Sequence, residues 1–143
     1  MSKHIIREDY ILNYMIYDDV LNNRDIDPYS DSKFRPIRNM SSKRKGRFFE
    51  QLTEEYVDHL GWKVSKPENT EHDTIINGKK VEIKGSFLWV TDGKLTHYRW
   101  QQIRPSHDYE YIVFLAVDPR KCEFYCSTKQ EVSDFVTIQD SNG

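Results

Sequence analysis

The chain has 143 residues, of which 37% are hydrophobic and 31% charged, and its formal net charge is -2. No apolar run approaches the ~20 residues that a membrane-spanning helix needs, and no signal-peptide pattern opens the sequence. We therefore expect a single intracellular domain over residues 1–143 with no membrane partner.

Charge is distributed unevenly along the first third of the chain. Residues 1–31 carry three basic and seven acidic side chains, whereas residues 32–49 carry seven basic side chains and no acidic one. Such a basic block is either a solvated linker or the footprint of a protein that binds the phosphate backbone of nucleic acid. Composition leaves these two interpretations open.

The first forty residues are expected to form an N-terminal helical arm and a linker. Apolar side chains wrap much of a predicted helix over residues 8–22, which must be covered on more than one side, by the domain or by a second subunit. In the segment that follows, residues 25–39, Pro and Ser interrupt regular structure.

The predicted core, residues 41–135, opens with a helix that Ser41 or Ser42 can cap and Gly61 can end. Glu50 lies at the border of the apolar stripe of this helix, where it can face the edge of the domain. The stripe itself recurs at helical spacing and consists of Phe48, Phe49, Leu52, Tyr56, Val57 and Leu60.

Strands dominate the rest of the core. A short strand at 62–65 precedes a hairpin that runs toward residue 89, and residues 91–106 are expected to contain a turn and a short helix. The apolar run 109–117 is predicted at the centre of the sheet, and 122–127 is predicted as an edge strand in which Cys122 and Cys126 are reduced thiols. With a last helix at 128–135, this order predicts an α/β or α+β fold, in which helices flank a central mixed β-sheet.

The hairpin contains an unusual arrangement of charge. Asn77-Gly78 is the strongest short-range signal for a two-residue turn, and it places Asp73 opposite Glu82. Like charges directly opposite one another on paired strands are destabilising. A divalent cation between the two carboxylates would remove the repulsion, so we expect a metal site here.

Mg²⁺ suits this site because it takes hard oxygen ligands and keeps several waters, and Mn²⁺ is expected to substitute for it. The Ile83 carbonyl could add a third ligand. A water on the metal, with its pKa lowered, becomes a nucleophile. Alternation places Lys84 on the same strand face as Glu82, where its ammonium can orient this water or stabilise charge on a phosphoryl oxygen.

The pattern D-x8-E-x-K across a hairpin, preceded by a helix that carries a Glu, resembles the PD-(D/E)xK nuclease superfamily and its restriction-endonuclease-like fold. The resemblance covers residues 45–117 and implies Asp73 and Glu82 as metal ligands and Lys84 as the catalytic lysine. It also implies that Glu50 orients Lys84 or assists a second metal, and that Gln101 or Gln102 serves on a following helix. His72 stands where the superfamily's name has Pro.

The resemblance implies a Mg²⁺-dependent endonuclease of double-stranded DNA, of restriction or homing type. Because one site cuts one strand, a homodimer or higher homo-oligomer is expected. The basic residues 32–47 would lie along phosphates, and Arg and Gln suit base edges. The residues expected to contact DNA are Lys43, Arg44, Lys45, Arg47, Lys94, His97, Arg99, Gln101, Gln102 and Arg104.

Two alternatives remain at this point. The stretch KRKGRFFE, residues 43–50, resembles the opening of archaeal Holliday-junction resolvases, although the first forty residues and the segment 97–105 fit that pattern poorly. The second alternative is a DNA-binding module that keeps the fold without the chemistry. Retention of Asp73, Glu82 and Lys84 together argues against this module, because a decayed site usually loses one of them.

Overall fold

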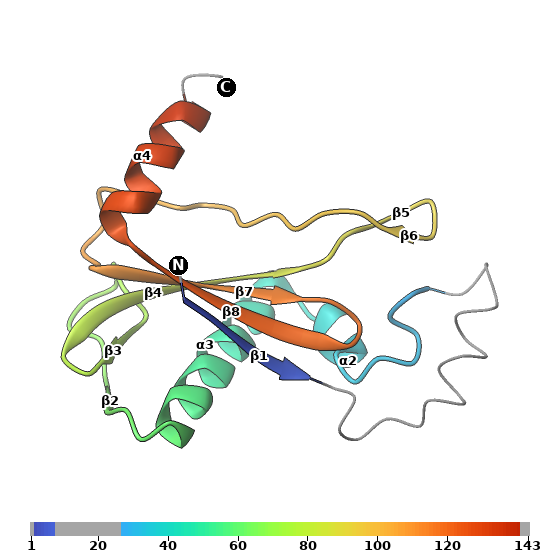
Figure 1. Ribbon diagram of the computed structural model, residues 1–143, viewed down its shortest axis with the longest axis horizontal. Helices are drawn as coiled ribbons and strands as arrows, with labels where there is room; N and C mark the ends of the chain where they lie inside the picture. The colour runs from blue at the N-terminus through green and yellow to red at the C-terminus, as the bar shows by residue number, and fades with distance from the viewer. Residues whose placement is uncertain (1, 8–26, 141–143) are drawn as a thin grey trace.

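The structure is a computed structural model that describes residues 2–7 and 27–140, with side chains described for 27–134. Over these ranges a six-stranded mixed sheet runs in the order β1-β8-β7-β4-β3-β2, and helices lie on both of its faces (Figure 1). The elements of the sheet are β1 (Ser2–Arg7), β2 (Val64–Ser65), β3 (Thr74–Ile76), β4 (Lys79–Phe87), β7 (Tyr111–Val117) and β8 (Lys121–Thr128).

The other elements are a separate two-stranded ribbon and three helices. The ribbon consists of β5 (Val90–Thr91) and β6 (Lys94–Leu95), and it projects away from the main sheet (Figure 1). The helices are α2 (Arg35–Arg38), α3 (Ser42–His59) and α4 (Lys129–Asp140). No helix in the described ranges has both the length and the apolar character that crossing a membrane requires.

The pairing confirms the expected mixed α+β fold. β4 and β7 are parallel, whereas the neighbouring pairs are antiparallel. β7 is buried almost throughout because the sheet is covered on both sides. Phe49 and Val57 of α3 pack with Val81, Ile83 and other core residues on one face, and a second cluster around Ile112 and Phe114 fills the opposite face.

The helix α3 begins and ends where the sequence predicts. Ser41 is its N-cap and accepts a hydrogen bond from the amide of Arg44. At the other end Gly61 has a φ of +83°, and the amide of Trp62 donates to the carbonyl of Val57 at 3.0 Å. This pairing closes the helix in the way that a left-handed glycine permits. Leu60, predicted in the apolar stripe, is 39% exposed because it lies at the C-cap.

The hairpin also has the predicted register. Asn77 and Gly78 have φ values of +50° and +79°, as a two-residue turn of this type requires, and Ile76 pairs with Lys79. Thr74 pairs with Val81, so the alternation of β4 follows as expected. Val81 and Ile83 are buried toward α3, whereas Glu82 and Lys84 are half-buried on the other side of the strand.

Two expectations about the sheet and its connections are wrong. β8 is not an edge strand, because β1 pairs with it in antiparallel register from Ser2–Cys126 to Arg7–Lys121. Residues 91–106 contain the expected turn, at Asp92 and Gly93 between β5 and β6, but no helix. The chain beyond the ribbon, residues 96–104, has no regular secondary structure. The Trp100 indole donates to the Leu115 carbonyl at 3.0 Å, and Gln102 has a left-handed φ of +56°.

The N-terminal region only partly corresponds to an arm and a linker. Residues 2–7 add a strand to the sheet, and Tyr29 is fully buried, so part of this region belongs to the same folded body as the core. A one-turn helix, α2, interrupts the segment expected to be irregular. The helix predicted over residues 8–22 lies outside the described residues. Cys122 and Cys126 are free thiols, as expected, and Cys122 is buried.

Candidate functional site

Three carboxylates from separate elements converge at the point where β3 and β4 diverge. Glu50 comes from α3, Asp73 precedes β3, and Glu82 lies on β4. All three line a pocket of about 360 Å³, together with Lys84 and Gln102. The structure therefore brings together the four residues that the sequence assigned to catalysis and one of the two candidate glutamines.

Backbone hydrogen bonds hold Asp73 against β4. Its amide donates to the Val81 carbonyl at 3.0 Å, and its Oδ2 accepts from the Ile83 amide at 2.7 Å. The amide and the carbonyl of one strand residue point to the same side of the strand. Because Ile83 donates toward Asp73 and lines the pocket, its carbonyl also faces the side of the strand where Asp73 lies.

The proximity of the acids is reflected in their pKa values. Burial, reinforced by the charge of Asp73 and a hydrogen bond with it, raises the pKa of Glu50 to about 7. Burial and the same carboxylate of Asp73 raise the pKa of Glu82 to about 8, against the opposing effect of the Lys84 ammonium. The cluster therefore resists carrying its full negative charge at neutral pH without a compensating cation.

The donor set suits a hard divalent cation. Carboxylates and a backbone carbonyl are the protein ligands that Mg²⁺ takes, and the open pocket leaves room for its waters. No group of three or more His, Cys, Asp or Glu side chains in the described ranges is arranged as a ready-made metal centre. Oδ2 of Asp73 accepts a hydrogen bond from the Ile83 amide. The residues thus fit the cation, and binding would require the carboxylates to rearrange.

Gly85 allows α3 to approach this part of β4 closely. A Cβ built on Gly85 would lie 2.2 Å from Cδ2 of Phe49, which is well inside any real contact distance. Phe49 is 5% exposed and immediately precedes Glu50 on α3. The absence of a side chain at Gly85 therefore sets the separation between the helix that carries Glu50 and the strand that carries Glu82 and Lys84.

One solved structure that is similar to this chain is that of the bacterial homing endonuclease I-Ssp6803I. The two chains are 24% identical, the match covers 63% of this chain and 67% of that chain, and the TM-score is 0.47. No protein-family model matches the chain, and no curated protein is significantly similar to it.

A larger groove of about 670 Å³ adjoins the carboxylate pocket. The two cavities share four lining residues, Ser42, Lys45, Phe49 and Gly85. Three of the residues predicted to contact DNA line the groove, namely Lys45, Arg99 and Gln101. The groove and the pocket therefore form one continuous surface across the N-terminal end of α3.

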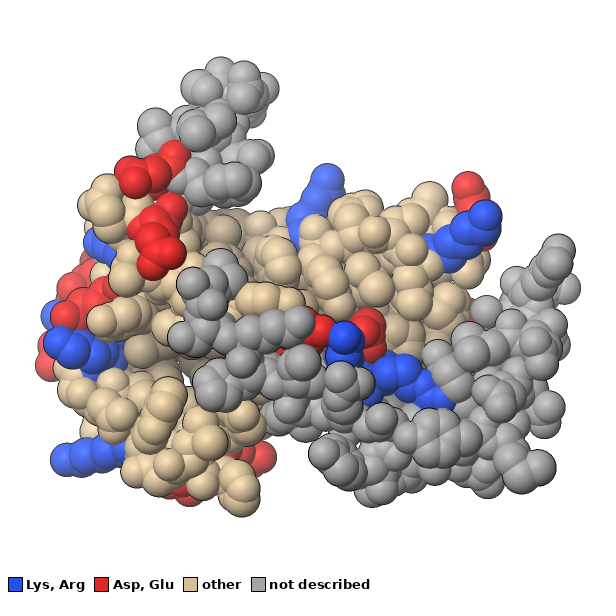
Figure 2. Space-filling model, viewed as in Figure 1, with Lys and Arg blue, Asp and Glu red and all other residues tan. Residues whose placement is uncertain are grey.

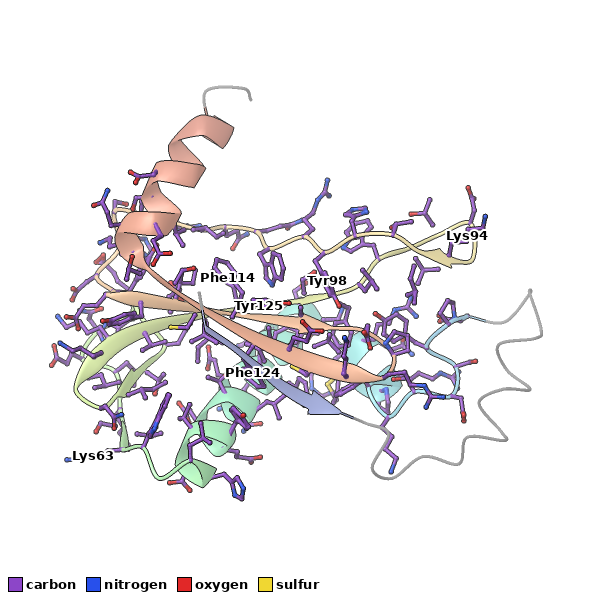
Figure 3. All side chains as sticks on the ribbon, viewed as in Figure 1. Lys63, Lys94, Tyr98, Phe114, Phe124 and Tyr125 are labelled. Atoms are coloured by element: carbon purple, nitrogen blue, oxygen red, sulfur yellow. The ribbon has the colours of Figure 1, made fainter. Side chains whose placement is uncertain are left out.

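The remaining predicted DNA contacts lie elsewhere. Lys43, Arg44 and Arg47 are exposed on the first turns of α3, and Arg104 is exposed in the chain that follows the ribbon. His97 stacks on Trp89 with ring centroids 5.5 Å apart, and Lys94 lies at the tip of the ribbon (Figure 3). On the face shown in Figure 2, basic and acidic side chains are interspersed among the described residues.

Arg38, Asn39 and Ser42 also line the groove, and they lie within the predicted phosphate-binding stretch 32–47, which does not single them out. They belong to the basic block 32–49, so the composition pointed to the right region. Which side chains of that block face the groove depends on the short helix α2 and on its connection to α3. The local sequence did not predict that geometry.

Proposed function

We propose that the chain is a Mg²⁺-dependent DNA endonuclease that hydrolyses phosphodiester bonds at specific sites, as restriction and homing enzymes do. The observation that carries this proposal is the pocket in which Glu50, Asp73 and Glu82 meet Lys84. Clustered carboxylates with raised pKa values beside a lysine are typical of catalytic sites. The basic groove next to the pocket supports a polyanionic substrate.

In this proposal Asp73, Glu82 and the Ile83 carbonyl hold the cation, and Mn²⁺ substitutes for Mg²⁺. When bound, Mg²⁺ neutralises charge on the phosphoryl oxygens and lowers the pKa of water. Glu50 reaches the same pocket from α3, where it orients Lys84 or assists a second metal ion. It completes a set of three carboxylates. Their negative charges attract the cation, and the cation relieves the repulsion between them.

Lys84 has a distinct role because it places a positive charge beside the carboxylates of the pocket. It lies next to Glu82 on the same face of β4, and its charge opposes the rise in the pKa of Glu82. As the phosphorus is attacked, negative charge develops on its oxygens, and a positioned ammonium stabilises that charge. The same ammonium orients the attacking water by donating a hydrogen bond to its oxygen.

The test is plasmid cleavage with Mg²⁺ and with EDTA. We expect nicking or linearisation with Mg²⁺, none with EDTA, and a loss of about 10²-fold or more in Lys84→Ala. Lys79→Ala is the matched control, because Lys79 lies on the same strand but is exposed at its start. Binding of DNA by Lys84→Ala should persist. Undiminished cleavage by Lys84→Ala, or cleavage that ignores EDTA, would contradict the proposal.

Two further measurements test the oligomeric state and the type of DNA substrate. One pocket cuts one strand, so we propose a homodimer or a higher oligomer, which light scattering on the purified protein would reveal. A four-way junction and a linear duplex of matched sequence should be compared as substrates. Preferential nicking of the junction would assign the chain to structure-specific resolvases.

A further inference from the structure

Three cations around the groove each lie over an aromatic ring. Arg38 Cζ is 4.4 Å from the centroid of Tyr29, Lys45 Nζ is 5.7 Å from that of Phe87, and Arg99 Cζ is 5.2 Å from that of Trp89. These distances are within the range in which a ring face attracts a cation. The three cations come from α2, α3 and the chain after the ribbon, so three separate parts of the sequence supply one surface.

Two of these rings, Tyr29 and Phe87, are anchored in the body of the domain, whereas Trp89 is 45% exposed and stacks on His97. Tyr29 is fully buried, and its hydroxyl donates to the carbonyls of Leu88 at 2.8 Å and Val117 at 3.2 Å. Phe87 packs edge-on against Tyr29 with ring centroids 6.0 Å apart, and it also packs against Phe49 with centroids 5.7 Å apart. Tyr29 and Phe87 therefore form a fixed floor, and Arg38 and Lys45, which rest on them, lose less conformational entropy when they bind an anion.

Among the described residues that line the groove, basic side chains outnumber acidic ones. Arg38, Lys45 and Arg99 oppose one carboxylate in this part of the chain, that of Asp27, which forms an ion pair with Arg38. The amide of Arg99 donates to the buried Ser86 hydroxyl, which fixes the backbone from which that guanidinium extends. Asn39, Ser42 and Gln101 supply neutral hydrogen-bonding groups around the same space.

We propose that this groove binds the sugar-phosphate backbone of the cut DNA strand where it leaves the carboxylate pocket, with Arg38, Lys45 and Arg99 as its phosphate contacts. This proposal rests on the proposed nuclease function and adds the path of the substrate. The groove is larger than one phosphate needs and lies next to the pocket, with which it shares four lining residues, so a continuous strand could pass from one to the other. Asp27 competes with the phosphates for Arg38.

The test measures binding of a fluorescein-labelled duplex of mixed sequence by anisotropy, in EDTA and over a series of salt concentrations. Each phosphate contact contributes about 0.9 to the slope of log K against log salt concentration. We therefore expect Arg38→Ala, Lys45→Ala and Arg99→Ala each to reduce this slope by about that amount. Lys63→Ala is the control, because Lys63 is exposed beside β2 and lies far from the ribbon (Figure 3).

Asp27→Asn tests the competition directly. Removing the charge of Asp27 frees Arg38 to bind phosphate. The affinity for the duplex should therefore increase by up to about fivefold, which corresponds to the free energy that an exposed ion pair contributes. Arg38→Lys keeps the charge and should restore most of the binding that Arg38→Ala loses. Thermal unfolding of each variant in the same buffer separates lost binding from lost folding.

The groove proposal fails if the three alanine variants, still folded, bind the duplex with the affinity and salt slope of the wild type. Failure of the nuclease function is detected separately, with bis(p-nitrophenyl) phosphate and Mg²⁺ and with plasmid DNA. A wild-type protein that hydrolyses neither substrate, but whose duplex binding depends on Arg38, Lys45 and Arg99, would support the groove and contradict the catalytic assignment.

Discussion

The amide of Ile83 donates to Oδ2 of Asp73 at 2.7 Å, which links a residue expected to bind the metal to the strand that carries Glu82 and Lys84. β3 begins only at Thr74, so this side chain continues the pairing beyond the start of the strand. Asp73 therefore has two separable roles. Its oxygen satisfies a backbone amide, and its charge contributes to the carboxylate cluster.

Substitutions of Asp73 should separate these roles. Asp73→Ala leaves the Ile83 amide without its partner, so the free energy of unfolding should fall by about 1–3 kcal/mol. Asp73→Asn keeps an oxygen that can accept the hydrogen bond, so it should retain most of the stability while losing Mg²⁺-dependent cleavage. Urea unfolding and plasmid cleavage check the two effects. Equal stability of the two variants would contradict the structural role of the oxygen.

The stability of the metal-free protein should depend on pH in an unusual direction. The pKa values of Glu50 and Glu82 rise on folding from an ordinary value of 4.5 to about 7 and about 8. The folded state therefore binds protons more tightly than the unfolded state. Stability should be greatest below pH 4.5, as far as these two groups determine it, and should fall as the pH rises from about 4.5 to about 8.

Thermal unfolding in EDTA across this pH range measures the effect. Glu82→Gln cannot ionise, so it should lose part of the pH dependence and should be more stable than the wild type at pH 8. Mg²⁺ competes with protons for the same oxygens, so its stabilising effect should be larger at pH 8 than at pH 5. An identical pH dependence in Glu82→Gln and in the wild type would exclude this explanation.

Gly85→Ala should destabilise the fold through a clash with Phe49. The new Cβ would overlap the buried ring, and such overpacking typically costs ~1–3 kcal/mol. Gly46→Ala is the matched control, because nothing lies within 4 Å of a Cβ at this helical position, and it should stabilise by about 0.5–1 kcal/mol. Urea unfolding measures both variants.

A second substitution shows whether the ring is the cause. Phe49→Leu shortens the side chain that Gly85→Ala would strike, so the double variant should be less destabilised than the sum of the two single variants. If the changes in the free energy of unfolding were strictly additive, the cost of Gly85→Ala would not come from a clash with the Phe49 ring.

The two adjacent glutamines should affect different steps. Gln102 lines the carboxylate pocket and is held there at a φ of +56°, whereas Gln101 lines the neighbouring groove. Gln102→Ala should slow cleavage of bound DNA about fivefold, which corresponds to the net free energy of one hydrogen bond. It should leave the affinity for DNA almost unchanged. Gln101→Ala should chiefly weaken binding. Single-turnover cleavage and anisotropy distinguish them, and identical effects of the two variants would refute the assignment.

Local sequence was sufficient to predict the hairpin and α3. Asn77-Gly78 permits the required positive φ values, and the register and the strand alternation then follow from the turn. Ser41 and Gly61 mark the ends of α3 for similarly local reasons. The positions of Asp73, Glu82 and Lys84 relative to one another could therefore be predicted, since one turn relates all three.

The strand β1 and the chain over residues 96–106 could not be predicted in this way. The sequence of β1 has few apolar residues, and its conformation is determined by pairing with β8, which is more than a hundred residues away. Arg99 and Trp100 were compatible with a helix. However, the Arg99 amide donates to the Ser86 hydroxyl on β4, and the Trp100 indole donates to the Leu115 carbonyl on β7. Tertiary contacts overrode local propensity at both places.

The amino-acid sequence by itself determined the acidic hairpin, because its geometry depends on the backbone freedom of two turn residues and on strand alternation. Only the tertiary structure decided that Glu50 completes the cluster and that Arg38, Lys45 and Arg99 surround one groove beside it. Those relationships depend on how closely α3 packs over Gly85 and on where the buried Tyr29 ring lies. Packing between elements distant in the chain sets both, and no local pattern encodes it.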